Sequence, residues 1–199
     1  MAAPSPIAWT IGGVPAIGIC GSGVISLMAA LLEAGMVSES GAFTDEADSI
    51  AEESEQGPAH RGLVIAEAEG RGGKRIVFTQ KDVREFQLAK GAIRAGIDIL
   101  SDEMGMAPEA LYLAGGFGQN IDIESAFRVG LIPREMSGRI YFAGNTSLGG
   151  CADACVEGGP DAPLPALAIT AAAQEINLGS HKDFNNKFME TMMFEEANA

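Results

Sequence analysis

The amino-acid sequence predicts an α/β fold, with a mixed sheet flanked by helices, and three observations lead to it. Two apolar runs, at residues 111–114 and 139–143, each lead into a glycine-rich turn and then into a helical segment. Residues 80–104 repeat apolar side chains at spacings of three and four, as an amphipathic helix does. Two further apolar runs, 62–67 and 74–78, flank a glycine turn and are typical of a hairpin.

Composition limits the possible classes of function. The 199 residues suit one domain, which we expect to span residues 1–199, and a hydrophobic share of 47% provides a sizeable core. The net charge of −14 argues against nucleic-acid binding, which needs clustered Lys and Arg. No apolar run reaches the length of a membrane span and the first residues lack a signal-peptide pattern, so we expect a cytoplasmic protein without membrane contact.

Cysteine and acidic residues add two expectations. Three cysteines, Cys20, Cys151 and Cys155, are too few for a disulfide framework and fit a reducing compartment. The second and third share one helix face without a His or Cys cluster beside them, so we expect small buried side chains and no metal or iron–sulfur site in this chain. The acidic segment at residues 38–58 is expected to be a solvated loop inserted in the domain.

Two strands and a helix are expected at the N-terminal end. The strands are residues 7–11 and 14–20, on either side of a double-glycine turn. Residues 24–34 are apolar on nearly every side, which predicts a buried helix that Gly35 ends.

Gly21, Ser22 and Gly23 form the turn that leads into this helix. Backbone N–H groups at such a strand-to-helix turn can hold a phosphate. Close packing of the helix on a sheet explains the glycines equally well, and the sequence leaves both explanations open.

The longest expected helix has a well-marked start. Thr79 is the expected N-cap and Asp82 completes a capping-box variant, while Phe78 and Val83 are placed to form a hydrophobic staple. The core-facing stripe is expected to consist of Val83, Phe86, Ile93, Ile97, Leu100 and Met104. Lys90 falls in the gap of that stripe, where it either extends to an edge or meets a nucleotide or a carboxylate.

The candidate ligand-binding edge follows this helix. The strand at 111–114 leads into Gly115, Gly116, Phe117 and Gly118, and the strand at 139–143 leads into Gly144 and Asn145. Glycines directly after a strand let the backbone approach a ligand or a neighbouring backbone. Because ligands in open α/β sheets bind at the carboxyl ends of the strands, these two turns are the expected binding edge.

Three helices are expected after the first of these turns. Asn120 is expected to cap a helix that runs through Ala126 and is closed by Gly130 and Pro133. A small-residue helix follows the second glycine turn, and residues 161–174 are expected to form an alanine-rich helix.

The chain is expected to end in a short strand at residues 176–178 and a packed helix. Ser180 and Asp183 can form the capping box of that helix. Its packed face would carry Phe184, Phe188 and Met192. The sequence indicates no partner for His60 or for His181.

Five motifs stand in one order along the chain. They are Gly18-Ile-Cys-Gly-Ser-Gly-Val-Ile, Gln80-x-Asp-x-x-Glu-x-Gln-x-Ala-Lys-Gly-Ala-Ile, Leu113-Ala-Gly-Gly-Phe-Gly, Gly130-Leu-Ile-Pro and Gly144-Asn-Thr-Ser-Leu. In these motifs, and in the tail from His181 to Phe194, the chain resembles the carboxy-terminal part of the reductive activators of corrinoid proteins. The resemblance covers most of residues 7–194, and the acidic segment is matched least.

The resemblance implies a fold and an activity. The family belongs to the superfamily of sugar kinases, actin and heat-shock chaperone ATPases, with two ribonuclease-H-like lobes around a nucleotide. Its members resemble ATP-dependent electron donors, in which a ferredoxin-like domain with an iron–sulfur cluster reduces the Co(II) corrinoid of a methyltransferase system to Co(I). The partners that this implies are the corrinoid protein and, in a homodimer, a second copy of the chain.

The resemblance also implies roles for single residues. Gly115, Gly116 and Phe117, followed by Gly118, match the loop that holds adenosine. Gln87 and Lys90 lie on the helix that borders adenine and ribose in the superfamily.

Parts of the family pattern have no match in this chain. These are the phosphate loop with its acidic residue, the first lobe and the cluster-binding cysteines. The chain therefore resembles the second lobe alone, as a fragment or as one piece of a split protein. ATP would bind with magnesium held by the missing lobe, the cluster would lie in the missing amino-terminal domain, and the isolated chain is expected to have little or no turnover.

Two other readings of the sequence remain. The first is a non-catalytic dimerisation and partner-docking module, in which the glycine turns serve packing only. The second is a kinase of small acyl or sugar substrates, for which fold analogy is the only support.

Overall fold

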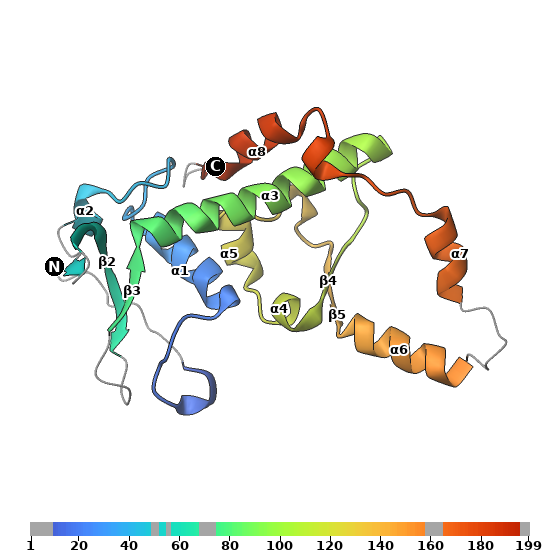
Figure 1. Cartoon of the computed structure of the whole chain (residues 1–199), viewed down its shortest axis with the longest axis horizontal. Helices are drawn as coiled ribbons and strands as arrows, with labels where there is room; N and C mark the ends of the chain where they lie inside the picture. The colour runs from blue at the N-terminus through green and yellow to red at the C-terminus, as the bar shows by residue number, and fades with distance from the viewer. Residues whose placement is uncertain (1–9, 49–51, 55–56, 68–74, 158–164, 196–199) are drawn as a thin grey trace.

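The computed structural model describes residues 10–48, 52–54, 57–67, 75–157 and 165–195. Helix α3 (Gln80–Met104) runs across the molecule, as Figure 1 shows. Helix α8 (Phe184–Met192) lies along one side of α3, and α1 (Gly21–Glu33) and α5 (Ile123–Arg128) lie on the opposite side. The long helix therefore joins the C-terminal segment to the rest of the core.

The N-terminal strand prediction is wrong for the described residues. Residues 14–20 form no strand, and Ile11–Gly13 is a short 3-10 helix, η1; residues 7–9 lie outside the described residues. A strand needs a neighbouring strand, and the side chains of Val14 and Ile17 are exposed instead. The predicted helix is confirmed as α1, and it ends where Gly35 adopts a φ of +68°.

The acidic segment is not one continuous loop. It contains α2 (Asp45–Asp48), β1 (Glu52–Ser54) and the start of β2 (Gly57–Glu67). Ala47 is completely buried, which attaches α2 to the core in spite of its acidic neighbours. The charged residues of this segment therefore surround a short structured excursion.

The described strands form two separate sheets within the predicted α/β class. Strands β1, β2 and β3 (Arg75–Thr79) form an antiparallel sheet, in which Leu63 pairs with Phe78. This is the predicted hairpin, although its turn lies outside the described residues. Strands β4 (Leu111–Ala114) and β5 (Ile140–Gly144) form a parallel pair.

The start of α3 was predicted correctly, but its buried face only in part, since Val83 is buried and Phe86 packs on the core as expected. The capping box is present, because the Thr79 N–H donates to Asp82 Oδ2 at 2.7 Å and the Asp82 N–H donates to Thr79 Oγ1 at 3.3 Å. In the predicted stripe, however, Ile93 is 52% exposed and Met104 is 66% exposed. The buried residues of the helix are Val83, Gln87, Lys90, Gly91, Ala95, Gly96 and Ile99.

The C-terminal segment that contains α8 and the turn before it explains this shift of the buried face. A β-carbon at Gly91 would lie 2.8 Å from Met192 Cγ, and one at Gly96 would lie 3.2 Å from Leu178 Cδ1. The smallest residues of α3 thus face its closest neighbour. Apolar periodicity alone could not reveal this, because the residues that permit close packing are glycines.

The N-cap of α5 (Ile123–Arg128) differs from the expectation. Asn120 does not cap α5, since its amide Nδ2 donates to the Gly116 carbonyl at 2.8 Å and closes the short helix α4 (Gly115–Gln119). Asp122 caps α5 instead, accepting from the Ser125 N–H at 2.8 Å. Gly130 ends α5 as predicted, with a φ of +71°.

Helices α6 (Thr146–Glu157) and α7 (Pro165–Ala172) extend away from the core, and Figure 1 shows them at one end of the molecule. Helix α7 occupies the predicted alanine-rich segment, of which residues 161–164 lie outside the described part. Cys151 and Cys155 are exposed, contrary to the prediction, because they lie on this extended part.

The last helix has a different start from the one predicted. No strand forms at residues 176–178, and η3 (Leu178–Ser180) precedes α8. The capping box with Asp183 is absent, because the Ser180 N–H bonds to Asn177 Oδ1. His181 does have a partner, Glu103, with Nε2 and Oε1 3.1 Å apart; the side chain of His60 lies outside the description.

The core lies between α1, α3, α5 and the antiparallel sheet. Its most completely buried large side chains are Met28, Ile99, Val83 and Val129. Within the described part of the chain, no helix is long and apolar enough to cross a membrane.

Candidate nucleotide-binding edge

The two predicted glycine turns lie at one edge of the β4–β5 pair. The strands are parallel, and Ala114 pairs with Gly144 at their carboxyl ends. The turn of Gly115 (φ +80°) into α4 and the turn of Gly144 (φ +71°) toward α6 therefore begin side by side. Gln119 packs close by, because its Nε2 would lie 3.3 Å from a β-carbon at Gly144.

The space around Gly116 is open. Its φ is not in the left-handed region, and no described atom would lie within 4 Å of a β-carbon at this position. Glycine in a helix costs up to about 1 kcal/mol relative to alanine. Contacts among the described residues therefore do not account for this glycine, and the space beside it is free for a ligand.

Gly118 differs from Gly116 because packing explains it. A β-carbon there would lie 3.2 Å from the backbone carbon of Leu113, on the strand that precedes α4. The glycine turn is thus closely packed on its strand side and open on the other.

Phe117 connects this edge to the start of α1. Its ring carbon Cε2 would lie only 2.8 Å from a β-carbon at Gly21. Both residues line a cavity of about 500 Å³ between α1, β3, α3 and α4. The volume is within the usual range of small-molecule sites. The wall is mostly apolar, and its polar members are Asp82, Glu85 and Lys90.

The remaining residues of the Gly21 turn are used for capping. Cys20 is the N-cap of α1, and its Sγ accepts from the Gly23 N–H at 3.3 Å. Hydrogen bonds from the Ser22 hydroxyl and this N–H lower the pKa of the Cys20 thiol. Ser22 and Gly23 line a second cavity, of about 960 Å³, on the side of Asn120. The described contacts of this turn are therefore packing and capping contacts.

Asn145 also acts locally as a cap. Its side-chain Oδ1 accepts from the Leu148 N–H at 3.0 Å, in the first turn of α6. The next two residues of α6 are Gly149 and Gly150, and β-carbons there would meet no described atom within 4 Å. The second turn is thus as open as the first.

Gln87 is buried, and each of its polar atoms has a partner. The side chain is 3% exposed and does not line the cavity. Its Nε2 donates to the carbonyls of Ser40 and Met192, both at 3.2 Å, and its Oε1 accepts from Arg84 at 2.9 Å. The residue thereby joins α3 to the turn before α2 and to the end of α8.

Lys90 is buried as well, at 2% exposure, so it does not extend to an edge. Its Nζ donates to the Met193 carbonyl at 2.5 Å and lies 4.7 Å from the centroid of the Phe194 ring. Burial lowers the pKa of Lys90 to about 8; nearby Glu195 raises that pKa and Arg94 lowers it further. The lysine also lines the cavity beside Phe117.

The structure thus brings Gly21, Phe117 and Lys90 together around one cavity. Gly115, Gly116, Gly144 and Asn145 form the adjacent sheet edge, and Gln87 lies behind the wall. Phe194 was not among the predicted site residues. The signal that could have pointed to the C-terminal segment is the spacing of three between Gln87 and Lys90, which places two polar residues on one buried helix face in need of partners. Their partners are the carbonyls of Met192 and Met193, next to Phe194.

Among the residues that the structure describes, no group of three or more His, Cys, Asp and Glu side chains is arranged to hold a metal ion.

Comparison with known families decides the assignment. Residues 3–199 match a family model that is described as the C-terminal domain of RACo, the ASKHA domain. The chain belongs to this family. This agrees with the resemblance in the sequence motifs and with the predicted fold class.

Relatives and a solved structure agree with the family. The chain is 35% identical over 133 residues to the corrinoid activation enzyme RamQ of Eubacterium limosum, covering 62% of this chain and 22% of that protein. It is 29% identical over 180 residues to a [Co(II) methylated amine-specific corrinoid protein] reductase of Methanosarcina barkeri, covering 89% of this chain and 29% of that protein.

The solved structure is a reductive activator for corrinoid, iron–sulfur protein. It matches with a TM-score of 0.77 and 29% identity, over 95% of this chain and 30% of that one. The chain therefore spans between about a fifth and a third of the length of the proteins it matches.

Proposed function

We propose that this chain is the nucleotide-binding C-terminal lobe of an ATP-dependent reductive activator. The complete activator would reduce the Co(II) corrinoid of a methyltransferase system to Co(I). The observation that carries the proposal is the family match over residues 3–199, which the TM-score of 0.77 to a reductive activator supports. The names of the two curated relatives point to the same activity.

In this proposal, adenosine binds at the glycine edge and against Phe117. The open space over Gly116 would admit the ligand, and the apolar cavity beside Phe117 would enclose its flat ring. The polar atoms of Gln87 and of Lys90 already have hydrogen-bond partners within the chain. We therefore propose that these two residues support the wall that faces the nucleotide.

The lobe would hold nucleotide and would not by itself transfer electrons. The phosphate groups, magnesium and the iron–sulfur cluster would be held by polypeptide outside this chain. Its partners would be the corrinoid protein and a second copy of the activator, in the cytoplasm.

Titration calorimetry with ADP on the 199-residue chain tests the proposal. We expect binding with Kd on the order of 1 mM, or about −4 kcal/mol, because only one wall of the site is present. Gly116→Arg should weaken binding at least about 10-fold, since its side chain would fill the open space above α4.

Met106→Arg is the matched control. It adds the same charge at an exposed residue after α3 that lines neither cavity, so the affinity should stay at the original value. Circular dichroism checks that both variants fold. If the unchanged chain fails to bind ADP, or if both variants bind equally, the glycine turn serves packing and the proposal is wrong.

A further inference from the structure

The C-terminal strap, residues 178–195, is attached to α3 along its length. Met192 packs on Gly91, where a β-carbon would come within 2.8 Å of its Cγ. Thr191 Oγ1 donates to the Gly91 carbonyl at 3.0 Å. At the far end of α3, Lys187 Nζ lies 2.8 Å from Asp102 Oδ2. The strap is therefore held at both ends of its helix.

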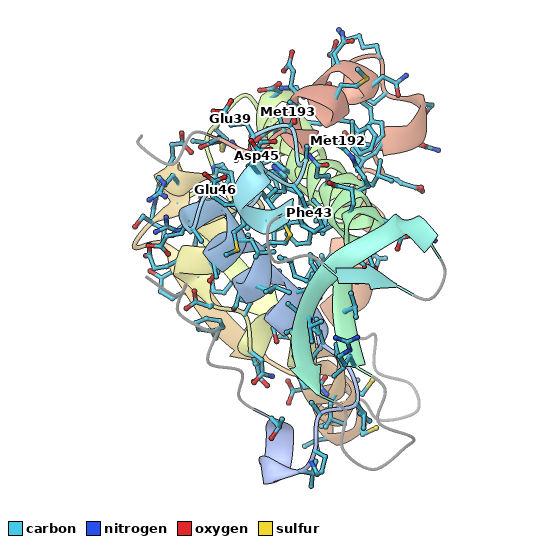
Figure 2. All side chains as sticks on the ribbon, turned by 90° about the vertical axis from the view of Figure 1, so that its left-hand side faces the viewer. Glu39, Phe43, Asp45, Glu46, Met192 and Met193 are labelled. Carbon is cyan, nitrogen blue, oxygen red and sulfur yellow. The ribbon has the colours of Figure 1, made fainter. Side chains whose placement is uncertain are left out.

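Its last residues are fastened by polar groups of α3 and of the turn before α2. Lys90 Nζ donates to the Met193 carbonyl, and the Phe194 N–H donates to the Glu39 carbonyl at 2.9 Å. Figure 2 shows Glu39 next to Met193, although the two are far apart in sequence. Phe194 is one of the most buried residues of the chain. These contacts hold the end of the strap against α3 and against the turn before α2.

Lys90, which holds the strap, is also part of the wall of the cavity beside Phe117. Lys90 and Phe86 line it from α3. On its other side, the Phe86 ring stacks on Phe194, with centroids 6.3 Å apart. The strap thus contacts two residues of the cavity wall, Phe86 and Lys90, from behind.

We propose that Lys90 and Phe194 are positioning residues of the nucleotide site, and that strap docking and nucleotide binding strengthen each other. The inference rests on the proposed function, which it extends with a coupling between two parts of the fold. Because such a coupling is reciprocal, nucleotide must protect the strap by the same factor by which strap docking improves nucleotide affinity.

The ionisation of Lys90 gives the strap a pH dependence. The docked lysine has a pKa of about 8, and the ordinary value is 10.5. The undocked state therefore binds more protons between pH 8 and pH 10.5, so docking strengthens as the pH rises through this window. The charges acting on the ammonium group are Glu195 on the strap and Arg94 on α3. The loop after α5 also reaches Lys90, but the residue that comes close to its Nζ is Gly130, which carries no charge.

The first experiment needs no nucleotide. Hydrogen-exchange protection factors of residues 187–195 are measured in the full chain from pH 7 to pH 9.5. Protection should rise above pH 8 in the unchanged chain and be independent of pH in Lys90→Met. The profile tests whether the docked strap buries Lys90, so a flat profile in the unchanged chain overturns the role of Lys90 in docking.

The second experiment measures the coupling with ADP as the probe. At saturating ADP, protection of the strap should rise about 10-fold, within the usual range for coupled sites. Phe194→Ala should weaken ADP binding by the same factor. Met189→Ala, which removes an exposed α8 side chain, should leave the affinity unchanged. If Phe194→Ala does not fold, the effect of ADP on hydrogen-exchange protection of the strap in the unchanged chain still tests the coupling.

The outcomes separate the two proposals. If ADP binds but leaves strap protection unchanged, or binds Phe194→Ala with full affinity, the coupling is wrong and the proposed function stands. If ADP does not bind the unchanged chain, the proposed function is wrong, and the coupling with it.

Discussion

Individual glycines serve different purposes in this chain. The space that a β-carbon would find at each position tells these purposes apart. Gly91 faces Met192 so closely that a β-carbon would meet Cγ at 2.8 Å and the Met192 backbone at 3.3 Å. Gly150, in the middle of α6, meets no described atom within 4 Å. The first glycine is required by packing between helices, and the second is not.

Alanine substitution should therefore have opposite effects at these two positions. Gly91→Ala overpacks the contact with α8, which costs about 1–3 kcal/mol, and helix propensity returns at most about 1 kcal/mol. Gly150→Ala gains helix propensity without a clash, so it should stabilise α6 by up to about 1 kcal/mol. Urea unfolding of both variants measures the difference. Equal stability of Gly91→Ala and the unchanged chain would mean that α8 does not pack closely on α3.

Single buried polar residues were the hardest to predict. The sequence placed Lys90 in the gap of an apolar stripe but could not identify its partner, since that partner is a backbone carbonyl 103 residues away. The same holds for Gln87 and the carbonyl of Met192. Backbone acceptors carry no sequence signal, so only the fold could reveal these contacts.

Helix ends were predictable from local chemistry where a cap and its target are a few residues apart. Thr79 and Asp82 formed the expected box, and Gly35 and Gly130 ended their helices. Strands 14–20 and 176–178 were not formed, because a strand depends on a distant partner that periodicity does not supply.

The cap of α5 provides a test at this scale. Hydrogen bonds from the Ser125 hydroxyl and N–H lower the pKa of Asp122 below its ordinary value of 3.8. Because the pKa is lowered in the folded state, the charged cap stabilises the protein above about pH 3.8, and this contribution is lost as the pH falls through the lowered pKa.

Asp122→Ala should therefore cost about 1 kcal/mol at pH 7, and less as the pH falls below 3.8. Asp122→Asn keeps an oxygen acceptor that does not titrate, so its own contribution should not change with pH. Urea unfolding at pH 7, 5 and 3.5 makes the comparison. A cost of Asp122→Ala that stays constant down to pH 3.5 would contradict the assignment of Asp122 as a charged cap.

At the scale of the whole molecule, the exposed apolar side chains of the described residues are distributed unevenly. Tyr112 and Tyr141 stack at 5.4 Å on one face of the β4–β5 pair, and Phe142 is exposed on the other face. Ile93 and Leu100 of α3 are exposed too. Parallel strands are normally covered on both faces, and two-stranded sheets are marginal alone. The fold class was predictable from strand and helix patterns, but this uncovered surface was not, because the same patterns normally mark a buried sheet.

We therefore expect the isolated chain to self-associate through the β4–β5 faces, in line with the homodimer expected from the sequence. Sedimentation velocity at tens of micromolar should show species larger than the monomer. The double substitution Tyr112→Lys and Tyr141→Lys should shift the distribution toward monomer, because it replaces the exposed aromatic pair with charged side chains that are costly to bury in a contact between chains. Leu88→Lys, at an exposed α3 residue, adds a charge away from the sheet and should leave the distribution unchanged. A strictly monomeric chain, or association that survives the double substitution, would exclude these faces as the contact.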